Sequence, residues 1–337
     1  METQKTIARR FNISQMSVSR ILNDRPGVSK ELKRKVLSYV ENEGCYINRI
    51  ASSLISGKTN MIGLLVPSMS YSFFPEITDR IEDLCQRNNY YPIIFHTSED
   101  YNRMANGVKL LIEMRAEGLI ITPPARSQGN DIYRQLIRMK IPFVFIDRYV
   151  PGIRSSYVVT DAIGGSRKAV EYLAGLGHKR ILHVRGPAKS SAAEEVYRGY
   201  REVMREKGLG EMTTDGGSYE EKGGYEAARE ILRKGMKPTA VFAINDPVAI
   251  GVMEALDELG IGVPEDISVM GFSDINMSSR LKIPLTTMKE YPQKIGEKAF
   301  SILREMIRNG KPVVRNIRID SDLIIRESTS AVSKTGR

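Results

Sequence analysis

Short apolar runs alternate with longer amphipathic stretches along most of the chain, from residue 61 onward. Eight of these runs are strand candidates, each followed by a polar or amphipathic segment: 62–66, 92–95, 119–121, 143–146, 158–159, 181–184, 240–244 and 267–272. Continuous apolar runs are typical of strands buried on both faces, so the pattern predicts a parallel α/β fold with two sheets. Two later runs, 285–288 and 323–325, are placed to return and complete those two sheets.

The first 60 residues have the apolar spacing of three short helices. We expect Thr6 to cap the first helix, Ser14 to cap a second that runs from Gln15 to about residue 23, and Ser29 to open the third. Asn12 suits a left-handed turn between the first two helices. The predicted core of this head is Ile7, Ala8, Phe11, Val18, Ile21, Leu22, Leu32, Val36, Leu37 and Val40. Two helices joined by so short a turn form a helix-turn-helix, whose second helix can enter the major groove of DNA.

With its apolar side buried, the second helix leaves a polar set outside: Gln15, Met16, Ser17, Ser19, Arg20 and Asn23. Gln15 can bond to adenine, Arg20 to guanine, and Met16 can contact a thymine methyl group. The hydroxyl groups, with Ser14 and Asn23, suit phosphate oxygens. The alternative is an ordinary amphipathic helix with a polar outer face.

Charge is concentrated in the same segment. Residues 1–60 carry eleven Lys and Arg against five Asp and Glu, which makes this segment +6 of the chain's +10. A basic head suggests a polyanionic partner, although a solvated basic surface has the same composition. Two cysteines 40 positions apart, no apolar leader and no run of 18 apolar residues favour a reduced, cytoplasmic protein without a membrane partner.

The stretch from Ser14 to Asn23, followed by Val28, Ser29 and a third helix, resembles the DNA-binding head of the lactose-repressor (LacI) family. The resemblance implies a hinge helix over residues 48–59, with Leu54 as a wedge that enters the minor groove and bends the operator. Residues 45–47 (Cys-Tyr-Ile) depart from the family's usual Tyr-x-Pro, and Ser52 stands where an arginine is common. Alternatively, Leu54 belongs to the apolar side of a linker.

The resemblance extends to about residue 329 through the motifs around Gly177-His178, Asn245-Asp246 and Gly271-Phe272. It implies a small all-α helix-turn-helix head and an α/β body of two doubly wound lobes, like periplasmic sugar-binding proteins. The expected division by residue number is 1–46, the head; 47–60, the hinge helix and linker; 61–330, the core, with an N-lobe of about 61–160 plus 289–320 and a C-lobe of about 161–288 plus 321–330; and 331–337, the tail.

Side chains that follow strands are the candidates for binding an effector, because ligands of open α/β sheets lie at the carboxyl ends of strands. They are Tyr71, Phe73, Phe74, Asp147, Arg148, Asp161, Asn245 and Asp246. The aromatic rings can stack on a sugar or a base. Each residue also has a structural interpretation: Phe73 and Phe74 as core, and Asp161 as a helix cap.

Two further candidates are departures from the family. Many sugar-responsive members carry an arginine where this chain has Val196 and an aspartate where it has Ser273. Because these are strong polar clamps on a sugar, we hypothesise that the effector is not a simple neutral sugar held in the usual way. Alternatively, Glu194, Glu195 or Arg198 takes over, or a protein partner supplies the signal.

Three motif fragments fail as enzyme signatures. The Gly57-Lys58-Thr59 triplet lacks the earlier glycine of a phosphate loop, Gly271 lacks the second glycine of a nucleophile elbow, and Gly208 lacks the third glycine of a dinucleotide motif. We therefore expect no enzyme, no cofactor and no metal. The sequence predicts a homodimeric transcriptional regulator, most simply a repressor, with a double-stranded DNA operator and a small-molecule effector as partners. A receptor whose head binds RNA or protein is the rival hypothesis.

Overall fold

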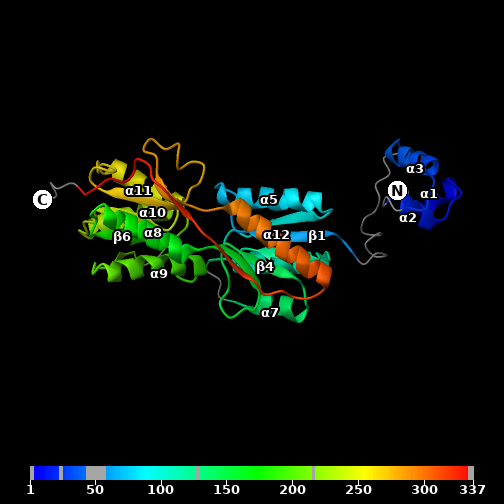
Figure 1. The fold of residues 1–337 in the computed structure, drawn as a ribbon, viewed down its shortest axis with the longest axis horizontal. Coiled ribbons are helices and arrows are strands. Elements are labelled where there is room, and N and C mark those ends of the chain that lie inside the picture. The colour runs from blue at the N-terminus through cyan, green and yellow to red at the C-terminus, as the bar shows by residue number, and fades with distance from the viewer. Residues whose placement is uncertain (1–3, 23–25, 43–57, 126–128, 215–216, 333–337) are drawn as a thin grey trace. The chain divides into compact units, whose positions relative to one another are not determined.

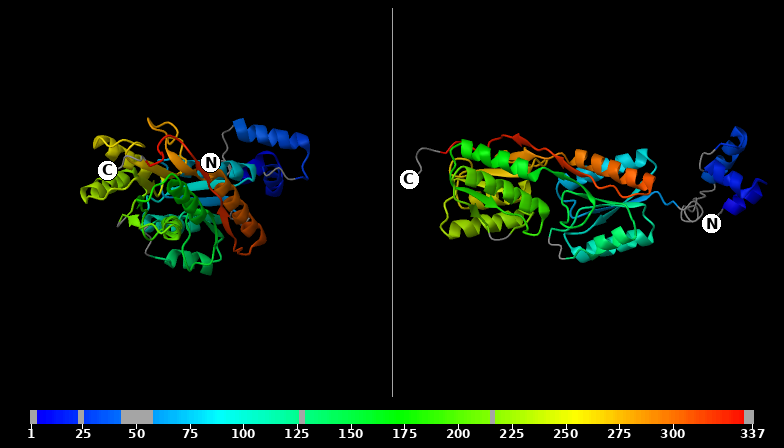
Figure 2. Two further views of the ribbon diagram at one scale, coloured as in Figure 1. Left: turned by 60° about the vertical axis from the view of Figure 1, so that its left-hand side comes forward. Right: turned by 60° about the horizontal axis from the view of Figure 1, so that its bottom comes forward.

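The structure is a computed structural model that describes residues 4–22, 26–42, 58–125, 129–214 and 217–332. The chain divides into two compact units, residues 1–59 and 60–337 (Figures 1 and 2). The first unit contains the helices α1 (Gln4–Arg10), α2 (Gln15–Leu22) and α3 (Lys30–Asn42). Ile7, Val18 and Val36, one from each helix, are buried together, which confirms the predicted three-helix head.

Two local predictions for the head have different outcomes. Asn12 has a φ of 49°, so the left-handed turn before α2 is confirmed. Thr6 lies inside α1, so the prediction that it caps this helix was wrong. Gln4 and Lys5 are good helix formers, and they extend the helix past Thr6 toward the N-terminus.

The described residues of the second unit form two sheets of six strands each. The first sheet has the order β11-β5-β4-β3-β1-β2, and all its neighbouring strands are parallel. Its strands are β1 (Met61–Val66), β2 (Tyr91–His96), β3 (Gly118–Ile121), β4 (Phe143–Ile146), β5 (Ser156–Thr160) and β11 (Asn316–Ile319). Its helices are α5 (Phe73–Arg87), α6 (Tyr101–Glu113), α7 (Asp131–Arg138) and α12 (Pro292–Asn309).

Helices cover both faces of this sheet, and the sheet with its helices forms the N-lobe. α5 and α12 pack on one face around Ile62 and Leu64 of β1. α6 and α7 pack on the other face against Leu65 of β1 and Phe145 of β4 (Figure 1). Apolar side chains of one strand thus enter two cores, which is why β1 reads as a continuous apolar run.

The second sheet has the order β12-β10-β9-β8-β6-β7. Its strands are β6 (Ile181–Val184), β7 (Met212–Thr213), β8 (Ala240–Ala243), β9 (Ser268–Ser273), β10 (Thr286–Lys289) and β12 (Asp322–Ile324). Its helices are α8 (Ala162–Gly175), α9 (Ser191–Glu206), α10 (Glu221–Arg233) and α11 (Asp246–Glu258). β12 runs antiparallel to β10, and the other pairs are parallel. This sheet and its helices form the C-lobe.

The two late apolar runs do not complete one sheet each. Both β10 and β12 belong to the second sheet, and the first sheet ends instead with β11, which the apolar pattern missed. The predicted two-sheet α/β fold is otherwise confirmed. The chain passes between the sheets three times: after β5, after β10 and after β11. Thr160, Glu290 and Asp320 lie at these three crossings.

Candidate functional site

The helix α2 presents the predicted DNA-reading side chains on a fixed backbone. Ser14 caps the helix, because its Oγ accepts a hydrogen bond of 3.0 Å from the backbone N–H of Ser17. Met16 is 65% exposed, a large exposed fraction for an apolar side chain. Gln15 and Arg20 are also exposed.

The remaining residues of that predicted set have other surroundings. Ser17 and Ser19 are half-buried, and the Ser14 hydroxyl is already engaged with the helix end and with Ser17 Oγ, at 3.0 Å. Asn23 and Leu54 lie outside the described residues. The structure therefore brings Gln15, Met16 and Arg20 to the surface as a group.

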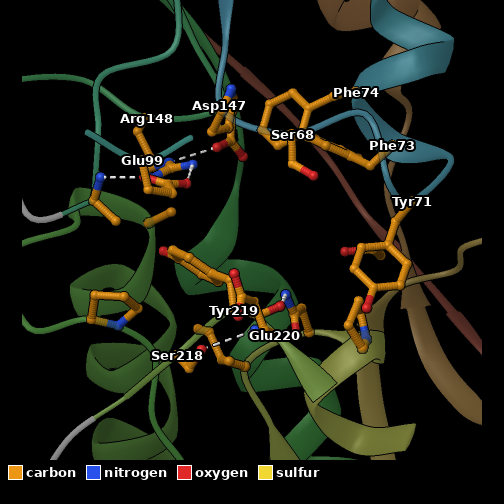
Figure 3. A pocket seen from close by; sticks show the side chains of 18 of the residues that line it. Ser68, Tyr71, Phe73, Phe74, Glu99, Asp147, Arg148, Ser218, Tyr219 and Glu220 are labelled. Atoms are coloured by element: carbon orange, nitrogen blue, oxygen red, sulfur yellow. Dashed lines mark hydrogen bonds and ion pairs between the residues drawn. The ribbon is translucent and has the colours of Figure 1, made fainter. Parts of the chain in front are cut away.

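In the second unit, a cleft of about 1050 Å³ is lined by residues of both lobes (Figure 3). Most of its walls are loops that follow strands, as expected for parallel sheets. Eight of the ten predicted effector residues line it: Tyr71, Phe73, Phe74, Asp147, Arg148, Val196, Asn245 and Ser273. Figure 3 shows Tyr71, Phe73 and Phe74 on one side of this space and Tyr219 facing it from another element.

Asp161 and Asp246 do not line the cleft, and both accept hydrogen bonds from the protein's own groups. Asp161 caps α8 by accepting a hydrogen bond from the backbone N–H of Gly164, at 3.2 Å. Asp246 is fully buried and accepts hydrogen bonds from the Ile275 N–H (2.9 Å) and the Ser278 hydroxyl (2.5 Å).

Asp246 also accepts a hydrogen bond from Thr287 Oγ1, at 2.5 Å. Burial raises the pKa of its carboxyl to about 6, although these hydrogen bonds act in the opposite direction. The side chain ties the start of α11 to two other parts of the C-lobe. A Cβ atom at Gly271 would overlap Asp246, so the two sequence motifs that contain these residues serve one packing contact.

Arg148 is the cationic centre of the cleft wall, and its guanidinium group is already occupied. Its Nη1 and Nη2 donate to the two carboxylate oxygens of Glu99, at 3.0 and 2.8 Å. Its Nε donates to Asp147 Oδ2, at 2.7 Å, and the group lies 5.1 Å from the ring centre of Tyr219. Burial raises the pKa of Asp147, against the effect of Arg148. Two carboxylates on one guanidinium leave this cluster negative overall.

Glu290 is a cleft residue that the sequence-based predictions missed. Its carboxylate accepts hydrogen bonds from Thr160 Oγ1 (2.5 Å) and Ser273 Oγ (2.7 Å). Burial raises its pKa to about 7. Glu290 thus places a carboxylate beside Ser273, the position where the resemblance to the LacI family implies an aspartate. It follows the predicted strand 285–288, so the strand-end rule itself was a signal for it.

The sequence-based predictions also missed Glu99 and Tyr219, which line the cleft. The sequence offered Glu194, Glu195 and Arg198 as replacements for the family's arginine and aspartate. Of these three, only Glu195 lines the cleft among the described residues. Arg318 binds Glu195 through two hydrogen bonds of 2.6 and 2.7 Å, and the Tyr149 hydroxyl donates a third, at 2.8 Å. Glu194 lies 3.7 Å from Arg185, and Arg198 binds Glu202 at 2.9 Å, both away from the cleft.

Comparisons with known proteins agree with this architecture. A model of the periplasmic binding protein-like domain matches residues 170–329. The HTH-type transcriptional repressor PurR of Histophilus somni (strain 129Pt) is 30% identical over 335 residues, which cover 98% of this chain and all of that protein. The chain belongs to the LacI family of transcriptional regulators.

Two further proteins are similar to this chain over nearly its whole length. The ribose operon repressor of Haemophilus influenzae is 28% identical over 97% of this chain and 98% of its own length. A solved structure of the lac repressor dimer bound to operator and the anti-inducer ONPF has a TM-score of 0.86 at 25% identity and covers 98% of this chain and 99% of its own. The protein is accordingly an effector-controlled, DNA-binding repressor.

The described residues contain neither a membrane-spanning helix nor a cluster of metal-binding side chains. Within residues 4–332, with gaps at 23–25, 43–57, 126–128 and 215–216, no helix has the length and apolar character needed to cross a bilayer. The same residues contain no group of three or more His, Cys, Asp or Glu side chains arranged to hold a metal ion.

Proposed function

We propose that the protein represses transcription as a homodimer on a pseudo-palindromic operator. The observation that carries this proposal is the capped helix α2 with Gln15, Met16 and Arg20 exposed on its outer face. Gln15 and Arg20 supply hydrogen bonds to base edges, and Met16 supplies an apolar contact. The lac repressor, which has the same fold, binds its operator as a dimer. Acting on DNA, the protein works in the cytoplasm and not as an enzyme.

An edge strand of the first sheet supports the homodimer. β2 is the edge strand of the first sheet, and its side chains Tyr91 and Ile94 are each 42% exposed. The next helix, α6, and its C-cap residue expose Leu110 (47%) and Met114 (39%) one turn apart. Exposed apolar side chains on and beside an edge strand are typical of an interface. A second copy of this surface is the occupant that we propose, since a two-fold axis makes one patch complementary to itself.

The effector binds in the cleft between the lobes in this proposal. Tyr71, Phe73 and Phe74 stack on the ligand, and Asp147, Arg148, Asn245, Ser273 and Val196 shape the polar and apolar contacts. Ligand binding changes how the lobes are held, which changes the spacing of the two hinge segments (47–60) and so the order of the hinge helices on DNA. Leu54 acts as the minor-groove wedge. The division into head, hinge and two lobes that the sequence predicts is part of the proposal.

Selection of bound fragments from sheared genomic DNA tests this function. We expect the full-length protein at near-physiological salt to enrich a two-fold symmetric site with a fixed centre. Parallel selections with and without cell extract distinguish a protein that lacks its small-molecule co-repressor from a protein whose head does not read DNA. Failure to enrich any sequence in both would refute the DNA-reading role and favour a head that binds RNA or protein. Enrichment that needs a protein fraction of the extract would favour control by a protein partner.

A further inference from the structure

The cleft qualifies as a ligand site for reasons unrelated to its charge. Its volume of about 1050 Å³ is at the upper end of the range for small-molecule pockets. It lies between two lobes, and seven aromatic side chains of the described residues line it, Tyr71, Phe73, Phe74 and Tyr219 among them. The charge of its walls then indicates which class of molecule enters.

The walls are strongly acidic. Among the described residues, seven carboxyl side chains line the cleft against two cationic ones, Arg148 and Lys222. Arg148 is bound by Glu99 and Asp147 through three hydrogen bonds, and Lys222 lies 3.8 Å from Glu226 outside the cleft. A phosphate or carboxylate group would therefore face carboxylates and find both described cations engaged.

Glu290 is a cleft carboxylate without a cationic partner in the described part of the chain. The two groups that bind it, the Thr160 and Ser273 hydroxyls, are neutral donors. The nearest cation in sequence, Lys289, pairs with Asp274 at 3.6 Å, and none of the ion pairs within the described residues includes Glu290. A partly buried carboxylate is costly without an opposite charge, and two accepted hydrogen bonds leave it further lone pairs.

The aromatic side chains add to the same preference. Phe73 and Phe74 meet edge to face, with ring centres 5.1 Å apart, so ring faces and edges are held in place beside the cleft. Figure 3 shows these rings and Tyr71 across the space from Tyr219. The face of an aromatic ring attracts a cation and also stacks on the apolar face of a sugar ring.

We propose that the effector is a small polar molecule that carries a protonated amine, of the amino-sugar class, and that the amine pairs with Glu290. The cleft discriminates against phosphorylated and carboxylated sugars because Glu99 and Asp147 hold Arg148. This proposal rests on the proposed function of the cleft as the effector site and defines the chemistry of the effector.

Isothermal titration with charge-matched sugars tests the proposal on the full-length protein. The probes are three sets: glucose, galactose and mannose, each as the neutral hexose, the 2-amino sugar and the 6-phosphate. In at least one set we expect the amino sugar to bind on the order of tenfold more tightly than the neutral hexose, with the phosphate weakest. The proposal is overturned if in every set a neutral or phosphorylated member binds as tightly as the amino sugar, or if no amino sugar binds at millimolar concentration.

Two variants locate the effect. Glu290→Gln removes the charge and keeps the size, and it should abolish the preference for the amino sugar over the neutral hexose. Glu254→Gln makes the same chemical change at an exposed position of α11 outside the cleft and should leave the preference intact. An unchanged preference in Glu290→Gln would overturn the role of Glu290.

A second measurement needs no variant. In the wild-type protein, added salt should weaken binding of the amino sugar and leave binding of the neutral hexose unchanged. A preference that does not respond to salt would overturn the charge pairing even if Glu290→Gln fails to fold. Selection of bound DNA tests the proposed function, and sugar titration tests the effector class. Because the two measurements use different ligands, either proposal can fail without the other.

Discussion

The ion pair between Glu195 and Arg318 joins the two lobes and permits a quantitative test of burial. Glu195 lies on α9 of the C-lobe, and Arg318 lies on β11 of the N-lobe. Their side chains are 11% and 32% exposed, and two hydrogen bonds of 2.6 and 2.7 Å connect them. Arg318→Met leaves the carboxylate covered, with the Tyr149 hydroxyl as its remaining hydrogen-bond donor among the described residues.

The expected magnitude lies between two known limits. Exposed ion pairs contribute about 0.2–1 kcal/mol, and removal of one partner of a fully buried pair costs about 3–5 kcal/mol. Because Glu195 is nearly covered and Arg318 is about one-third exposed, we expect Arg318→Met to lower the free energy of unfolding by about 2 kcal/mol. We expect a coupling energy of about 1–2 kcal/mol in the double-mutant cycle with Glu195→Gln.

Urea denaturation at one fixed protein concentration measures the cycle, since association of subunits would change the apparent stability. The chain offers a matched control. Arg315 binds Glu305 with the same two-bond geometry, at 2.7 and 2.9 Å, but their side chains are 50% and 36% exposed. We expect a coupling energy below about 0.5 kcal/mol there. Equal coupling in the two pairs would refute the argument that burial gives the inter-lobe pair its strength.

Three further predictions concern the head, the hinge and the cleft. Arg20→Ala should cost about 1–3 kcal/mol at a specific site and relax base preference at one position, measured by binding to operator variants; an equal loss on random DNA would contradict base reading. Leu54→Ala should reduce operator affinity and DNA bending together in a gel-shift bending assay, and unchanged bending would exclude it as the wedge. Burial raises the pKa of Glu290 from 4.5 to about 7, so its stabilising contribution is complete below pH 4.5 and is lost as the pH rises toward 7. The stability of Glu290→Gln relative to wild type should therefore increase by about 1–3 kcal/mol between pH 5 and 8 in urea denaturation, and a constant difference would refute the shift.

Apolar runs predicted the central strands because these strands are buried on both faces. The predicted run 143–146 coincides with β4 (Phe143–Ile146), whose four side chains are all buried. β11 was missed because it is an edge strand with alternating exposure, and its Arg318 reaches Glu195. β7 was missed because a two-residue strand has no detectable period.

The strand-end rule located the cleft but did not determine the direction of each side chain. It correctly placed Asp147 and Asn245 at the cleft, and it failed for Asp246, the residue directly after Asn245. Neighbouring residues at a strand end point to different sides, and the hydroxyl groups of Ser278 and Thr287 that engage Asp246 come from distant parts of the chain. No local pattern contains that information.

The position of Glu290 links ligand chemistry to the geometry of the lobes. Glu290 lies where the chain leaves β10 for α12, and its partner Thr160 ends β5, where the chain first leaves the N-lobe. The hydrogen bond between them therefore joins two of the three crossings, and Ser273 attaches the same carboxylate to the C-lobe. In the proposed function, a ligand that contacts Glu290 acts on segments that connect the lobes, so differential affinity for two lobe arrangements requires no additional relay. The ion pair of Glu195 with Arg318, which lies two residues before the third crossing, joins the lobes without the Glu290 carboxylate. Arg318 variants should therefore change the resting arrangement of the lobes, and Glu290 variants should change the ligand response as well as the pH dependence of stability.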